Sequence, residues 1–356
     1  MKTSDVRVRR AITAVAAGQP VVLAGDADGD GRLVFAADAA TPRLVAFAIR
    51  HTSGYLRVAL PGSECERLNL PPMCHHDTAQ CVSVDFRGTG TGISARDRAR
   101  TIAALASPDS AAVDFVRPGH VLPVRAGADG VLGRAAAAEA AVDLADLAGR
   151  PRAAALGEIV SRRSPAKMAR GGEPVEFAVE HGLAVVSIAE LVAYRQRTEP
   201  QVLRVAESML PTPAGDSRVI GFRDVHGHGE HLAVIIGTAD AGVPVPLHVH
   251  VECLTGDVFG SRACRCGGEL HDALARMSAR GNGLVVYLRP PGPPRSCGLY
   301  ARGATGDPVS HTVAWILRDL GVYALKLSDA SPGFGIVLFG AIREHGIAPD
   351  ALAVAG

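Results

Sequence analysis

Residues 250–268 have the sequence HVECLTGDVFGSRACRCGG, and three of the chain's seven cysteines, Cys253, Cys264 and Cys266, lie in this stretch. Thiolates are soft ligands that favour zinc, at a metal–sulfur distance of about 2.3 Å. The Cys-x-Cys pair places two sulfurs on one tight turn, and the ten residues after Cys253 bring in the third. The spacing therefore predicts one zinc ion, Zn2+, held by these three side chains.

The number of ligands decides what such a zinc does. Three protein ligands leave one tetrahedral position open, which is typical of a catalytic zinc that activates water. A fourth ligand would make the site structural, and His248 or His250 could supply it. A third possibility is three buried thiols that bind no metal.

Length and composition predict two domains of a globular protein. The chain has 356 residues, 47% of them hydrophobic and 21% charged, so each half can bury a core of its own. The net charge of +1 provides no bulk field that would attract nucleic acid or an anionic membrane. We therefore expect no nucleic-acid or membrane partner, and a phosphorylated small-molecule ligand must be held by local groups.

The apolar segments and the cysteines indicate a cytoplasmic protein. No run approaches 18 apolar residues, and the first residues lead directly into a charged amphipathic segment rather than an apolar signal region. An odd number of cysteines, three of them clustered, favours metal binding in a reducing compartment over a disulfide framework.

Alternating helical and strand patterns predict a mixed α/β first domain. The polar stretch 195–200 is the expected boundary, giving domains 1–199 and 200–356. A His/Gly loop at 224–230, containing His226 and His228 and followed by His231, is expected to be an exposed hairpin. We expect helices at 5–17, 96–106, 135–147, 177–181, 189–195 and 269–278, and strands at 20–23, 184–188, 219–222, 231–236 and 284–288.

Several motifs resemble known enzyme families. The cysteine segment 250–257 with 264–267, together with 210–213 and Gly215, resembles GTP cyclohydrolase II. Four earlier segments resemble dihydroxybutanone phosphate synthase: RHTSG at 50–54, TGISARDR at 91–98, RPGHV at 117–121 and ELVAYR at 190–195. Their order along the chain is that of the fused, two-domain enzyme of riboflavin synthesis.

The resemblance implies two activities and two folds. The synthase family converts ribulose 5-phosphate to dihydroxybutanone phosphate and formate with magnesium, and builds its active site across a homodimer. The cyclohydrolase family opens the imidazole ring of GTP with zinc. The expected fold class is thus α/β and α+β, an N-terminal mixed α/β synthase-like domain followed by a C-terminal zinc-binding cyclohydrolase-like domain.

The synthase-like half departs from the family at its acidic loop. Where the family has Arg-Glu-x-Glu-Gly-Asp, this chain has Ala27, Asp28, Gly29, Asp30, Gly31 and Arg32. Asp28 keeps a carboxylate at a ligand-binding position but is one methylene shorter. Ala137 replaces a histidine that binds Mg2+ in the family, so magnesium binding should be severely weakened.

Three residues at family positions remain in this half. Arg134 is suited to binding a phosphate, and His120 and Glu158 occupy positions that the family uses in catalysis. For His120 the alternative is a structural histidine in a Pro-Gly turn, and Glu158 could equally be structural.

The cyclohydrolase-like half keeps its cysteines and loses residues that grip the nucleotide. The family's Gln-Glu-Gly-Arg is replaced by Pro290, Pro291, Gly292 and Pro293, which removes charged groups and backbone donors. The later Asp-x-Arg pair aligns best with Gly306 and Pro308, and the lysine of an Asn-Pro-Lys motif is missing around 331–333. We expect three residues to line any remaining ligand site: His248, Glu252 and Glu269. His248 stands where the family has an arginine.

Three hypotheses follow. The chain is a homologue with one or both activities lost or much reduced, or an enzyme repurposed for another sugar phosphate or nucleotide, or a weak riboflavin-pathway enzyme. The substitutions above favour the first, because losing a charge clamp and a general base each costs about 10²-fold or more in rate.

Overall fold

In the computed structural model the chain divides into two compact units, Met1–Arg195 and Gln196–Gly356. The structure describes residues 3–25, 29–73, 79–212, 215–226, 229–237, 244–299, 309–327 and 335–349. The α/β and α+β fold class expected from the sequence is confirmed. Among the described residues, no helix is long and apolar enough to cross a membrane.

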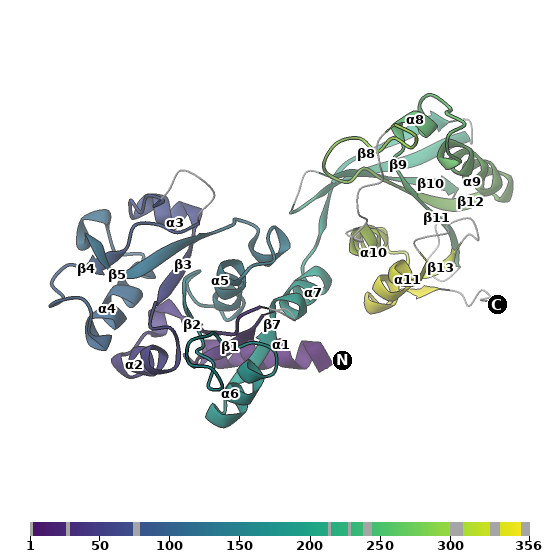
Figure 1. The fold of residues 1–356 in the computed structure, drawn as a ribbon. Helices are drawn as coiled ribbons and strands as arrows, with labels where there is room; N and C mark the ends of the chain where they lie inside the picture. The colour runs from purple at the N-terminus through teal and green to yellow at the C-terminus, as the bar shows by residue number, and fades with distance from the viewer. Residues whose placement is uncertain are drawn as a thin grey trace. The chain divides into compact units, whose positions relative to one another are not determined.

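The first unit is built on one mixed sheet with the strand order β4-β5-β3-β6-β2-β1-β7 (Figure 1). Helices cover both faces of this sheet, so its strands are buried on both sides. The strands are β1 Val21–Ala24, β2 Arg32–Ala36, β3 Arg57–Pro61, β4 Val84–Phe86, β5 Phe115–Ala126, β6 Ala154–Glu158 and β7 Ala184–Ser187.

Two apolar layers therefore hold the first unit together. One contains Val45 from α2 and Ile102 from α4, and the other contains Val8 from α1 and Leu144 from α5. The helices are α1 Thr3–Ala16, α2 Pro42–His51, α3 Gly62–Arg67, α4 Ala95–Leu105, α5 Ala137–Leu147, α6 Glu173–His181 and α7 Ile188–Thr198, with short 3-10 turns at Ala37–Ala39, Ala112–Asp114 and Gly130–Leu132.

The second unit has its own sheet, in the order β14-β13-β11-β12-β10-β9-β8. Helices α10 and α11 pack on one face through Ile316 and Ile342, and α9 packs on the other through Met277. The elements are β8 Val202–Thr212, β9 Gly215–Asp224, β10 Glu230–Gly237, β11 Val245–Val251, α8 Leu254–Asp257, α9 Cys266–Arg280, β12 Asn282–Leu288, α10 Val309–Asp319, β13 Ala324–Leu327, α11 Gly335–Glu344 and β14 Ala348–Pro349.

The predicted helices and strands are present, with boundaries that differ by a few residues. The helix expected from residue 269 begins three residues earlier, at Cys266. The polar stretch at 195–200 is largely helical, because α7 continues to Thr198. Trp315 on α10 donates from Nε1 to the carbonyl of Gln196 at 2.8 Å, so α10 is fastened to the beginning of its own unit.

Helix α4 positions the segment around Gly54. Ser94 is its N-cap and accepts a hydrogen bond from the Asp97 N–H at 3.0 Å. Arg98, buried in the next turn, donates to the carbonyl of Gly54 at 2.8 Å. The TGISARDR motif is therefore a cap and a buried clamp that hold the 50–54 segment in place.

We predict that Ser94→Ala lowers the free energy of unfolding of the first unit by about 1 kcal/mol, because an orphan N–H loses its acceptor. Urea denaturation followed by circular dichroism measures the change. Ser94→Asp is the matched control, since its carboxylate can cap the same N–H. Equal stability of the alanine and wild-type chains would contradict the capping role.

Candidate metal centre and synthase pocket

Two parallel strands bring distant cysteines to one edge of the second sheet. β11 and β12 pair in parallel, from Leu247 opposite Leu284 to Val251 opposite Leu288. Cys253 follows the end of β11, and Cys297 lies in the loop after β12. Because carboxyl ends of neighbouring parallel strands lie at the same edge, both side chains can reach one point.

The remaining two cysteines come from the start of α9. Cys266 is the first residue of that helix, and Cys264 lies two residues before it. Gly256 in α8 packs directly on the cluster, since a Cβ there would lie 3.0 Å from the sulfur of Cys264 and 3.3 Å from that of Cys253. A Cβ on Gly267 would lie 2.3 Å from the carbonyl oxygen of Gly256, so both glycines permit this close approach.

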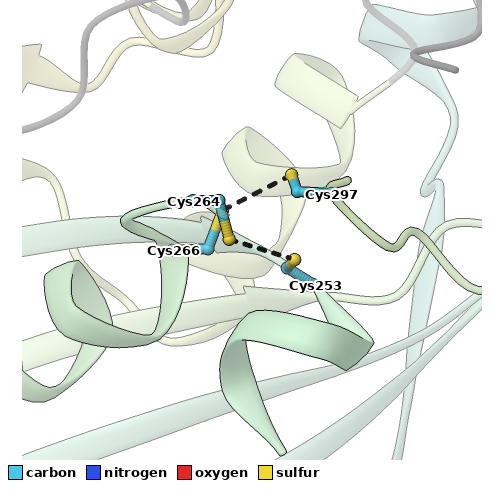
Figure 2. A group of neighbouring side chains, drawn as sticks. All are labelled: Cys253, Cys264, Cys266 and Cys297. Atoms are coloured by element: carbon cyan, nitrogen blue, oxygen red, sulfur yellow. Dashed lines mark hydrogen bonds between the residues drawn. The ribbon is translucent and has the colours of Figure 1, made fainter. Parts of the chain in front are cut away.

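Four sulfurs, not three, point toward one another (Figure 2). The Sγ atoms of Cys253, Cys264, Cys266 and Cys297 all lie within 4.8 Å of one another. Cys253 and Cys264 are 3.8 Å apart, and Cys266 and Cys297 are 3.9 Å apart. Four zinc–sulfur bonds of about 2.3 Å in a tetrahedron give a sulfur separation of about 3.8 Å, so this donor set fits the ion.

The fourth thiol, Cys297, was not identified from the sequence, where His248 and His250 were considered as the candidates for a fourth ligand. Neither histidine belongs to the sulfur cluster. Cys297 escapes a local motif search because it lies 31 residues after Cys266. The signal that could have revealed Cys297 is the pair of strands ending at 251 and 288. If these strands are parallel neighbours, the loops that follow them lie at the same edge of the sheet.

His250 is engaged below the cluster instead. Its Nε2 lies 3.0 Å from both carboxylate oxygens of Asp257, and its ring stacks on Tyr287. Asp257 also accepts hydrogen bonds from the Cys253 N–H and the Tyr287 hydroxyl, each at 2.8 Å. Desolvation by burial and the Asp257 carboxylate raise the pKa of Tyr287. Asp257 thus fixes the turn that carries the first cysteine.

The three residues expected to line a ligand site lie in different surroundings. His248 is only 2% exposed, and neither ring nitrogen has a hydrogen-bond partner among the described residues. Glu252 is paired with Arg289 at 3.2 Å. Glu269 is on the first turn of α9, 3.9 Å from Arg265. Their assignment to substrate binding stays a prediction.

The His/Gly loop is not simply an exposed hairpin. His231 is 1% exposed, with Nε2 at 3.0 Å from Asp224. Its Nδ1 accepts the backbone N–H of Arg289 at 3.1 Å. This histidine joins three segments because it lies near the start of β10, beside the end of β12. His228 lies outside the described residues.

In the first unit, His120 and Glu158 lie near the same end of the sheet. Arg57 on β3 is opposite Leu122 of β5 and Leu156 of β6. His120 comes two residues before Leu122 on a parallel strand, and Glu158 comes two residues after Leu156 on an antiparallel strand, so both lie beyond the same end of β3. His120 Nδ1 is 2.7 Å from Asp85, which also accepts the His120 N–H at 2.9 Å. The imidazole is therefore oriented by a carboxylate and is partly exposed.

Glu158 is held between two arginines. Arg57 and Arg32 both form ion pairs with its Oε1, and the Arg32 Nε lies 3.3 Å away. Desolvation by burial lowers the pKa of both guanidiniums. Arg32 is the residue that stands in place of the family's aspartate, so the substitution adds a cation that binds this carboxylate.

Arg134 lies at the other end of the strands. Its Nε donates to Glu139 Oε1 at 2.9 Å, and the same oxygen accepts the N–H of Gly127, which directly follows β5. Glu139 is fully buried, whereas the Arg134 side chain is 55% exposed. Arg134 can thus offer a guanidinium to solvent while Glu139 holds it in place.

The groups for magnesium do not fit. Ala137, the first residue of α5, offers only a methyl group. Asp28 and Ala27 lie outside the described residues. Asp30 from the same loop is paired with Arg170 at 2.6 Å.

Comparison with known proteins decides the family. Residues 9–194 match the family model for 3,4-dihydroxy-2-butanone 4-phosphate synthase, and residues 203–302 match that for GTP cyclohydrolase II. The riboflavin biosynthesis protein RibBA of Mycobacterium ulcerans is 49% identical over 294 residues, which cover 79% of this chain and 69% of that protein. The chain belongs to the fused dihydroxybutanone phosphate synthase/GTP cyclohydrolase II family of riboflavin biosynthesis.

Solved structures support this family assignment. RibBX, a two-domain 3,4-dihydroxy-2-butanone 4-phosphate synthase from A. baumannii, is 28% identical with a TM-score of 0.71, and the match covers 94% of this chain and 96% of that one. A 3,4-dihydroxy-2-butanone 4-phosphate synthase in complex with two magnesium ions is 38% identical with a TM-score of 0.51, over 54% of this chain and 97% of that one. The two-domain fold of RibBX therefore matches nearly the whole chain.

We predict that Gly256→Ala lowers metal affinity by about tenfold or more, because the new methyl group displaces two cysteine sulfurs from their positions. Competition with a chromogenic zinc chelator measures the affinity. Gly268→Ala is the matched control, since a Cβ there meets no neighbour within 4 Å. Unchanged affinity in the Gly256 variant would contradict the close packing on the cluster.

Burial of His248 predicts a pH dependence of stability. Desolvation, with His250 and Arg276 adding to it, lowers the pKa of His248 from 6.5 to about 4. The unfolded chain therefore binds more protons between pH 6.5 and 4, so this histidine destabilises the fold as pH falls through that range. The linked effect is at most about 3 kcal/mol, at about 1.4 kcal/mol per pKa unit.

We predict that His248→Leu reduces the loss of unfolding free energy between pH 6.5 and pH 4. Denaturant titrations at several pH values measure it. His226→Leu is the control, because it removes a half-buried histidine of the same unit. A pH dependence that is the same in the His248 variant and the wild type would show that His248 does not titrate with a lowered pKa.

Proposed function

We propose that this chain is a fused-family homologue in which both reactions are lost or strongly reduced, and that it binds a phosphorylated small molecule. The observation that carries the proposal is the double ion pair of Glu158 with Arg32 and Arg57. A carboxylate acts in proton transfer only when it can reach the substrate proton and accept it.

Two guanidiniums on one carboxylate oppose that role. The two guanidiniums occupy Oε1 of Glu158, so that oxygen is not free to accept a substrate proton. The side chain is also fixed in a pair that a substrate would have to break. General acid–base catalysis contributes about 10²- to 10⁴-fold to a rate, which is the size of the expected loss.

The metal ligands in this half support the same proposal. Magnesium requires near-octahedral oxygen-rich ligation, and Ala137 cannot coordinate it. Arg32 adds a positive charge beside the acidic loop, which further disfavours a cation there. We derive no reaction step through magnesium in this chain.

The described loop after β12, residues 289–299, has lost backbone donors that could bind a triphosphate. Pro290, Pro291 and Pro293 have no backbone N–H to donate, and Glu252 already pairs with Arg289. A GTP triphosphate carries about four negative charges that several cations or N–H groups must offset. GTP turnover is therefore expected to be weak or absent.

A second candidate function is an enzyme acting on another sugar phosphate. The oriented His120–Asp85 pair and the exposed guanidinium of Arg134 favour it, because they keep a proton-transfer group and a phosphate site. A weak riboflavin-pathway activity is the remaining alternative, and the 49% identity to the RibBA protein supports it.

We also propose a homodimer. Within one chain, the guanidinium of Arg134 and the N–H of Gly127 both donate to Glu139 at one end of the strands, and Glu158 is at the other end. Strand β3, which separates these ends, spans about 16 Å at 3.3 Å per residue. A pocket that uses both residues would take them from two copies, as the resemblance to the synthase family implies.

The deciding experiment is a pair of formate assays. Ribulose 5-phosphate with magnesium tests the first half, and GTP with zinc-loaded protein tests the second. We expect no formate above background from either substrate. Formate release at a useful rate from either would overturn the proposed loss, and saturable binding of another sugar phosphate would favour the second candidate.

We predict that restoring three residues recovers magnesium binding in the first half. Asp28→Glu and Ala137→His replace the missing ligands, and Arg32→Asp removes the added cation beside Glu158. Isothermal calorimetry measures the binding, and ribulose 5-phosphate turnover should rise at least 10²-fold if Glu158 is released. Ala136→His in place of Ala137→His is the matched control, and no gain over that control would contradict the alignment of this pocket.

A further inference from the structure

We propose that Cys297 is a fourth metal ligand, so that the cysteine cluster is a closed tetrathiolate site with no position for water. The site would hold zinc as a structural element of the second unit. This inference goes beyond the proposed function, because it concerns neither the synthase pocket nor the groups that bind GTP.

The loop that carries Cys297 is fastened to the turn that carries Cys253. The Leu254 N–H donates to the carbonyl of Arg295 at 2.7 Å, and the Thr255 hydroxyl donates to the carbonyl of Cys297 at 3.0 Å. These bonds flank the cluster without using a sulfur. The backbone therefore brings Cys297 to the other three thiols independently of any metal.

The next residue turns the loop in a way that favours glycine. Gly298 has a φ of +80°, and a Cβ there would lie 2.9 Å from the Cβ of Ala263. The left-handed backbone and the tight contact with the segment before Cys264 both require a residue without a side chain. This contact presses the Cys297 loop against the start of α9.

The sulfur positions match coordination better than a disulfide. The sulfurs of Cys266 and Cys297 are 3.9 Å apart, close to the edge of about 3.8 Å expected for zinc tetrathiolate. A disulfide needs about 2.05 Å between its sulfurs, so forming one would draw Cys297 away from the common centre.

Four thiolates change what the ion can do. A closed site contributes folding free energy, whereas hydrolysis needs an open position on which water is activated. The ion would join four segments: the end of β11, the α8–α9 connection, the start of α9 and the loop after β12. Even a restored GTP pocket would then lack a metal-bound water.

Replacing zinc by cobalt in the full-length chain tests the proposal. The sulfur-to-cobalt charge-transfer absorption scales with the number of thiolates, so Cys297→Ser should lower its intensity by about a quarter, from four ligands to three. X-ray absorption of the zinc protein should give four sulfur neighbours in the wild type and three in the variant. Azide should alter the cobalt spectrum only in the variant, because only there is a position exchangeable.

Two further variants complete the design. Ser296→Ala changes the neighbouring buried side chain of the same loop and should keep four sulfurs. Cys65→Ser removes a buried thiol of the first unit and should do the same. Loss of a supporting contact around a metal site lowers affinity by about tenfold. The zinc affinity of the Cys297→Ser chain should fall by more than that, because a ligand itself is lost.

Three sulfurs in the wild type, or an azide response there, would overturn the proposal. So would a Cys297→Ser chain that binds zinc with unchanged sulfur number and affinity. A Cys266–Cys297 disulfide, detected by mass spectrometry of peptides from non-reduced protein, would also refute it. None of these results bears on the ion pair of Glu158, and formate release from ribulose 5-phosphate would not bear on the sulfur count.

Discussion

The second unit depends on the parallel pairing of β11 with β12. That pairing places the ends of both strands at one edge of the sheet, so the turn after β11 and the loop after β12 meet there. Asp257 then fixes the first turn through the Cys253 N–H, and Gly256 and Gly267 allow α8 and α9 to approach closely. The four-cysteine cluster is a consequence of strand order and of two positions without side chains.

In the first unit, the controlling interaction is electrostatic. The carboxylate of Glu158 sits at the end of β6 with Arg32 on one side and Arg57 on the other. Partly buried charges are costly unless they are paired, so these three side chains stabilise one another. The same arrangement leaves Oε1 of Glu158 occupied by two guanidiniums.

Periodicity and motifs predicted much of the fold, because long elements carry repeated signals. The helix after Ser94 and the short strands expected at 20–23 and 284–288 follow from capping and apolar patterns, and the observed strands are Val21–Ala24 and Asn282–Leu288. The cysteine motif contains three of the four clustered thiols. The fourth, Cys297, depends on a strand pairing between segments about 40 residues apart, which no local pattern contains.

The partners of single side chains were harder to predict. The charge reversal at Arg32 was visible in the sequence, but its contact with Glu158 requires the register of β2 on β6. His231 was expected at the start of a strand beside an exposed loop, and its burial depends on tertiary contacts with Asp224 and Arg289. Polar residues in short loops carry little information about burial, because distant segments supply their partners.

The bond between Trp315 and Gln196 has a practical consequence. Trp315 is the chain's one tryptophan, and it lies in the second unit, with the guanidinium of Arg318 over its ring and His345 against its edge. Indole fluorescence therefore reports on that unit without background from its neighbour. The melting of the second unit can be followed optically in the intact chain, with no need to cut it in two.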